Sequence, residues 1–71
     1  MNIKLGDKIR ALRKSKNISQ EVLAQYLGVS FQAVSKWENG ENLPDVTMIP
    51  AIAIFFDVST DELFDINRLE T

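Results

Sequence analysis

The sequence contains no cysteine and no histidine. Without cysteine, neither a disulfide nor a thiolate zinc site can stabilise the fold. The absence of histidine removes the usual general base, the commonest metal ligand and the natural pH switch. Catalysis would then need paired carboxylates in a pocket, but Asp61, Glu62 and Asp65 are better interpreted as helix-start charges and solvated surface. We predict that the chain is not an enzyme and uses no cofactor or metal.

Long apolar runs are also missing. The longest, Met48 to Phe56, is far shorter than the ~20 residues that span a bilayer. Met1 leads directly into a charged helical pattern, which is not a secretory signal. We therefore expect one small, soluble, cytoplasmic domain with no membrane partner.

Positive charge is scarce and unevenly distributed. The net charge is −2 at pH 7. Residues 1–16 hold six cations and one acid, whereas residues 37–71 hold eight acids and one cation. A local basic face matters more for binding nucleic acid than the total charge. Taken alone, residues 1–16 are best interpreted as a solvated basic helix.

Helical spacing recurs along the chain, and no segment alternates apolar and polar residues over the length of a strand. Leu5, Ile9 and Leu12 fall at positions i, i+4 and i+7 and would form one buried stripe. The sequence predicts an all-α fold, a compact five-helix bundle. The expected helices cover residues 3–15, 20–27, 31–39, 46–56 and 60–65.

Capping residues mark the ends of these helices. Ser19 and Ser30 are the expected N-caps of the second and third helices, and Gly28 and Gly40 are the expected stops. Pro50 falls just inside the fourth helix, where it predicts a small kink or a late helix start.

The link between the second and third helices is the most informative feature. Only residues 28–30 separate them, and so short a link forces a sharp crossing, as in the DNA-binding helix-turn-helix. Ala24 is small enough for a close approach, and Val34 and Trp37 would face the core. The predicted motif spans about residues 19–40.

Several segments resemble one known family in register: IRALR at 9–13, SQEVLAQYLGVS at 19–30, VSKWENG at 34–40, LPD at 43–45 and VSTDEL at 58–63. They are similar to the Cro/C1-type helix-turn-helix domain, the XRE family of bacterial and phage regulators. The resemblance implies a lambda-repressor-like DNA-binding domain over residues 1–66. It also implies a sequence-specific transcriptional regulator, a repressor that occupies an operator. Residues 67–71 are expected to fray or to begin a further C-terminal region.

The exposed face of the third helix is the expected reader of bases. If Val34 and Trp37 are buried, the opposite face enters the major groove. Amide and ammonium groups there can pair with adenine, guanine or phosphate, and a phenyl ring can contact a thymine methyl or pack on Tyr26. The expected base-contacting residues are Phe31, Gln32, Ser35 and Lys36.

The resemblance assigns further roles. The residue matching Gln20 contacts phosphate and braces the recognition helix in that family, and Gln20 opens a helix, where an anion is favoured. Ser30 and Asn39 are expected to contact phosphate as well. Arg13 is expected to form a structural salt bridge with Glu38. Arg10 has two open interpretations, which are contact with the DNA backbone and exposure to solvent.

The remaining features concern partners. The loop 40–45 carries Glu41 and Asp45, where the family often has cations, so we expect weak monomer affinity and a modest salt dependence. The apolar residues of 48–56, together with Leu63 and Phe64, cover more than one helical face. Three interpretations are open for them: they belong to the core, they form a homodimer surface, or they face a missing C-terminal domain. A homodimer would match a double-stranded DNA operator with two-fold symmetry. A helical protein-interaction module or antitoxin that uses this surface is the alternative function.

Overall fold

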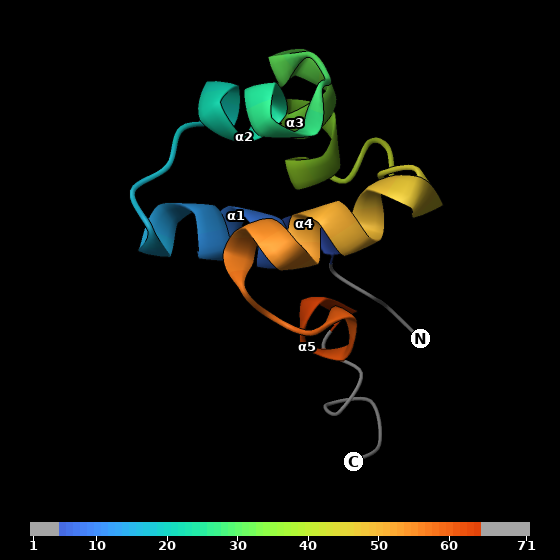
Figure 1. Cartoon of the computed structure of the whole chain (residues 1–71). Helices are drawn as coiled ribbons and strands as arrows, with labels where there is room; N and C mark the ends of the chain where they lie inside the picture. The colour runs from blue at the N-terminus through green and yellow to red at the C-terminus, as the bar shows by residue number, and fades with distance from the viewer. Residues whose placement is uncertain (1–4, 65–71) are drawn as a thin grey trace.

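The computed structural model describes residues 5–64, which form five α-helices and one 3-10 turn. These residues contain no strand, which confirms the all-α prediction. The predicted helix start at residue 3, the helix end at residue 65 and the tail 67–71 lie outside the described residues. The elements are α1 (Leu5–Ser15), α2 (Gln20–Leu27), α3 (Phe31–Glu38), η1 (Val46–Met48), α4 (Ile49–Phe56) and α5 (Thr60–Phe64) (Figure 1).

Local hydrogen bonds fix the ends of α2 and α3. The Ser19 and Ser30 hydroxyl oxygens accept from backbone N–H groups three residues ahead, at 3.1 and 3.2 Å. Gly28 adopts φ 74°, and its N–H donates to the last carbonyls of α2. The third helix ends one residue earlier than predicted, since Asn39 is its C-cap, and Gly40 then turns the chain with φ 79°.

Pro50 divides the predicted fourth helix. Residues 46–48 form the 3-10 turn η1, and α4 begins only at Ile49, which places Pro50 in its first turn. A proline there removes no intrahelical hydrogen bond, because first-turn N–H groups have no partner. Asp45 caps η1, and the backbone and hydroxyl hydrogen bonds from Thr47 hold the pKa of the Asp45 carboxyl below its usual range. Of the two predicted outcomes, the late start is observed.

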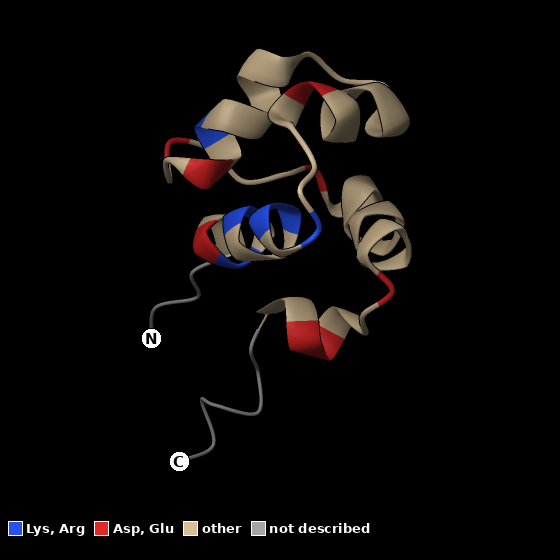
Figure 2. Cartoon of the chain, turned by 90° about the vertical axis from the view of Figure 1, so that its left-hand side faces the viewer, with Lys and Arg blue, Asp and Glu red and all other residues tan. Residues whose placement is uncertain are grey.

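The buried side chains form one core to which all five α-helices contribute. The α2–α3 pair lies on one side of α1 and α4, and α5 lies on the other (Figures 1 and 2). No helix within residues 5–64 has both the length and the apolar character needed to cross a membrane. The core consists of Leu5, Ile9, Leu23, Ala24, Leu27, Val34, Trp37, Ile49, Ile52, Ala53, Phe56 and Leu63.

The C-terminal apolar run is mostly core, and a remnant is exposed. Met48, Phe55 and Phe64 are half-buried, whereas Ile54 is 71% exposed. Leu43 and Val46, which precede the run, are 75% and 79% exposed. Beside them lies an apolar pocket of about 230 Å³. It is lined by Leu5, Leu43, Pro44, Val46, Ile49 and Phe64.

Candidate nucleic-acid interface

Helix α3 turns one face into the core and leaves the other open. Val34 and Trp37 are 0% and 6% exposed, so both are buried as predicted. Ala24 is buried on α2, which packs against α3 across the short turn. Gln32 and Lys36 lie on the opposite side of α3, and both are exposed. The crossing therefore leaves the side of α3 that carries Gln32 and Lys36 exposed.

A glycine lets α1 approach the end of α3. A Cβ atom at Gly6 would lie 2.0 Å from the carbonyl oxygen of Trp37, which no real contact reaches. The obstacle is backbone, so a rotamer change could not relieve the clash. We did not predict this role for Gly6; the available signal was an isolated glycine within a helical pattern.

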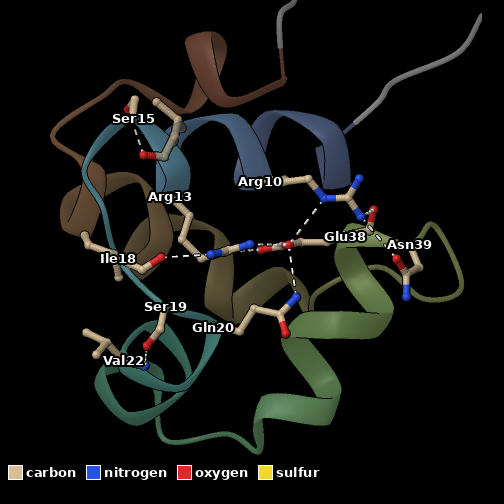
Figure 3. A network of polar contacts seen from close by, with 10 residues as sticks. Arg10, Arg13, Ser15, Ile18, Ser19, Gln20, Val22, Glu38 and Asn39 are labelled. Atoms are coloured by element: carbon tan, nitrogen blue, oxygen red, sulfur yellow. Dashed lines mark hydrogen bonds and ion pairs between the residues drawn. The ribbon is translucent and has the colours of Figure 1, made fainter.

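Glu38 is the buried centre of a polar network that joins α1, α2 and α3 (Figure 3). Its side chain is 0% exposed. Arg13 donates to it from Nε at 2.7 Å and from Nη2 at 2.9 Å, so the salt bridge that the resemblance implied is present. The third nitrogen of Arg13 donates to the carbonyl of Ile18 at 2.8 Å. The pair thus ties the end of α3 to α1 and to the loop before α2.

Gln20 and Arg10 complete the network. The Gln20 amide donates to Glu38 Oε1 at 3.1 Å, so Gln20 braces α3 from the start of α2. Arg10 Nη2 donates to the Glu38 carbonyl at 3.0 Å and to Asn39 Oδ1 at 3.1 Å. Our two interpretations of Arg10 both missed these intramolecular contacts, because neither considered the C-terminus of α3 as a partner.

Opposing effects set the charge state of Glu38. Burial by itself opposes the charged carboxylate, but the hydrogen bonds from Arg13, Gln20 and Arg10 and the charge of Arg13 outweigh it and lower the pKa of Glu38. The hydrogen bond to Glu38 raises the pKa of Arg13, although burial opposes this shift. The network is therefore ionised at neutral pH.

The other predicted site residues lie around the exposed face of α3. Phe31 is 44% exposed, Ser35 is half-buried and Asn39 is exposed. The Ser30 oxygen already accepts from a backbone N–H, but its hydroxyl hydrogen is available to a ligand. The Tyr26 ring packs against Phe55, with 4.7 Å between ring centroids.

Comparison with known proteins identifies this arrangement. The family model described as helix-turn-helix matches residues 9–63, which include α2, α3 and the network. The chain belongs to the helix-turn-helix family. The match extends from within α1 into α5, so it covers most of the described bundle and not only the two crossing helices.

Two curated relatives of this helix-turn-helix domain are regulators by name. It is 41% identical over 69 residues to the HTH-type transcriptional activator BcrR of Enterococcus faecalis, covering 97% of this chain and 34% of BcrR. It is 40% identical over 58 residues to the uncharacterised HTH-type transcriptional regulator YazB of Bacillus subtilis, covering 82% of this chain and 84% of YazB. The chain thus spans about a third of BcrR.

A solved structure shares the fold of this helix-turn-helix domain. The P22 c2 repressor, solved in complex with a synthetic operator, superimposes with a TM-score of 0.80 at 34% identity. The superposition covers 90% of this chain and 96% of that one. The lambda-repressor-like bundle predicted from the sequence is therefore confirmed.

The basic residues of α1 and the acids of α5 lie in different layers of the domain. The basic residues of α1 lie in the middle layer, and the acids of α5 lie on the side of the molecule away from α2 and α3 (Figure 2). Asp61 and Glu62 therefore do not cover the exposed face of α3. The arginines Arg10 and Arg13 are directed toward Glu38, so they add less to an external basic face than the sequence alone indicated.

Proposed function

We propose that this domain is a sequence-specific DNA-binding regulator of transcription whose helix α3 enters the major groove. One observation carries the proposal: the exposed face around Gln32 and Lys36 is backed by buried Val34 and Trp37. The ionised network around Glu38 fixes that face against α1 and α2. Rigid presentation of a few polar side chains is what base readout in the major groove requires.

The residue roles follow from position and chemistry. Gln32 donates to and accepts from adenine, and Lys36 donates to guanine or phosphate. Ser35, which is half-buried, lies at the edge of the face, and Phe31 offers an apolar contact to a thymine methyl. Gln20, Ser30 and Asn39 are proposed to bind phosphate, the first two at helix N-termini, where backbone N–H groups favour an anion.

Regulation needs no chemistry beyond binding. A bound domain excludes other proteins from its site, so occupancy of an operator is enough to repress, and we propose a repressor that acts in the cytoplasm without catalysis. The P22 c2 repressor was solved with a synthetic operator, which supports DNA as the ligand. BcrR is named an activator, so a reporter assay is needed to establish the sign of regulation here.

Selection of bound duplexes from a random-sequence pool, followed by sequencing, tests the proposal. The expected result is a palindromic consensus, because operators read by two-fold dimers mirror that symmetry. The second copy of the chain is proposed to pack on the apolar pocket beside Val46. A pool that remains unenriched after repeated rounds would contradict sequence-specific binding.

A protein-interaction module or antitoxin is the second candidate. It is favoured by one observation, the strong exposure of Leu43, Val46 and Ile54. Titration with a random-sequence duplex at low salt separates the two functions. Nonspecific DNA binding typically has a dissociation constant of about 100 μM or less. If no binding is detected below that concentration, the interaction module is favoured.

A further inference from the structure

The last carbonyl of α3 receives its hydrogen bond from another helix. Backbone N–H groups of residues 39–41 donate to the carbonyls of Ser35, Trp37 and Lys36. The carbonyl of Glu38 accepts instead from Arg10 Nη2 at 3.0 Å. Arg10 thus supplies a donor where an α-helix leaves its terminal carbonyls without an intrahelical partner.

The same nitrogen controls the orientation of Asn39. Arg10 Nη2 lies 3.1 Å from Asn39 Oδ1. Because a guanidinium carries only donors, the Asn39 amide must turn its oxygen toward Arg10. The amide NH₂ group then points away from Arg10 (Figure 3), and the residue is exposed. A donor is therefore presented at the end of α3.

We propose that Arg10 is a positioning residue that orients the Asn39 amide to donate to a DNA phosphate. The inference rests on the proposed function, in which Asn39 binds phosphate. Without Arg10 the amide would sample the reversed orientation, which presents an oxygen to the negatively charged backbone. The contact between Arg10 Nε and the Glu38 carboxylate is long, at 3.5 Å, so the shorter bonds of Arg10 are those to the end of α3.

A double-mutant cycle tests this role. Affinity for a fluorescent random-sequence duplex, two helical turns long, is measured at low salt for the wild type, Arg10→Met, Asn39→Ala and the double variant. Asn39→Ala is expected to weaken binding about tenfold, the loss of one hydrogen bond to a charged group. Arg10→Met should weaken binding about three- to tenfold in the wild type but less than about twofold in the Asn39→Ala background.

Controls separate positioning from loss of charge and from loss of folding. Lys14→Met removes the same charge from an exposed position of α1, and its effect is subtracted from that of Arg10→Met. Arg10→Lys keeps the charge and a donor and should recover part of the affinity. Circular dichroism at the assay temperature establishes that each variant is folded.

The salt dependence identifies the competing role, in which Arg10 itself contacts phosphate. Loss of a direct cation contact would reduce the slope of log K against log salt by about 0.9, whereas loss of the neutral Asn39 contact would leave it unchanged. A reduced slope, or equal Arg10→Met losses in both backgrounds, would overturn the positioning role and leave the proposed function intact. A wild type that binds no duplex would overturn both.

Discussion

Glu38 shows how one residue links folding and binding in this domain. Its carboxylate is fully buried, and it accepts hydrogen bonds from Arg13 and Gln20, so three helices depend on a single charge. Loss of one partner from a buried ion pair leaves the other charge uncompensated, which costs more than the pair itself contributes. The same contacts fix the end of α3, so damage to them should reach the DNA-binding face.

The first prediction concerns Glu38→Gln. The variant should lower the free energy of unfolding at pH 7 by about 3 kcal/mol, because Arg13 loses its charged partner. The pKa of Glu38 is lower in the folded state than in the unfolded chain, where it is near 4.5. The charged carboxylate therefore stabilises the fold above pH 4.5, and this contribution is lost as the pH falls through the pKa of the folded state.

Denaturant melts from pH 7 to pH 2 check this prediction. Below about pH 4.5 the wild type should lose stability more steeply than Glu38→Gln, so the two curves converge in acid. Parallel curves over the whole range would show that protonation of Glu38 does not cause the loss of stability in acid.

The second prediction concerns Gly6→Ala. Alanine is the better helix former by about 1 kcal/mol, so helix propensity alone would stabilise the variant. The added Cβ would lie 2.0 Å from the Trp37 carbonyl oxygen, however. Forcing apart two packed backbones costs about 1–3 kcal/mol, so we expect a net loss of stability. Thermal unfolding measures this loss of stability. Ala11→Gly, on the exposed side of α1, is the control that measures the effect of helix propensity alone. A raised melting temperature for Gly6→Ala would exclude the clash.

Elements were predictable where their signals are local. Ser19 and Gly28 determine helix ends through bonds within a few residues, and the periodicity of Val34 and Trp37 needs only their own helix. Pro50 left a kink and a late start open, because the choice depends on how η1 packs. The left-handed turn at Asp57 has φ 57°, and no glycine marked it.

Long-range contacts were harder to predict from sequence. Arg10 and Glu38 are 28 residues apart in the chain, and their contact appears only when α1 crosses the end of α3. Gly6 likewise depends on where Trp37 arrives. The Arg13–Glu38 pair was expected only because the sequence resembles a family. Composition and spacing therefore predicted the face of α3, but not the side chains that hold it in place.

The third prediction separates the two glutamines at the helix-turn-helix. Gln32 lies on the exposed face of α3, so Gln32→Ala should change base preference at one position of the selected site by about 1–3 kcal/mol. Gln20 opens α2 and braces Glu38, so Gln20→Ala should weaken all duplexes alike. Affinities for a panel of single-base variants of the selected site provide the measurement. Uniform, sequence-blind losses for both variants would contradict these roles.

At the scale of the molecule, the fourth prediction concerns self-association. Val46 is 79% exposed and lines the apolar pocket, so Val46→Asp should prevent a second copy from packing there. Affinity for a duplex that contains the palindromic site should then fall about tenfold or more, because binding of one domain no longer helps the second domain to bind. Ile54→Asp is the matched control, since Ile54 is 71% exposed and is not among the pocket-lining residues. Sedimentation of both variants with the same duplex gives the stoichiometry, and equal effects of the two substitutions would exclude the pocket as the interface.

The different positions of two acidic residues relative to α3 lead to the fifth prediction. Glu41 lies in the loop after α3, next to Gly40, and is exposed, whereas Glu62 is exposed on α5, across the molecule from α3. Glu41→Lys should steepen the slope of log K against log salt by about 0.9, because a new cation meets a phosphate. Glu62→Lys makes the same change of charge but lies farther from the interface, and screening at 0.1 M salt acts over about 10 Å, so its slope should stay near that of the wild type. Equal slopes for the two variants would mean that only net charge matters, and the DNA would then not lie across the end of α3.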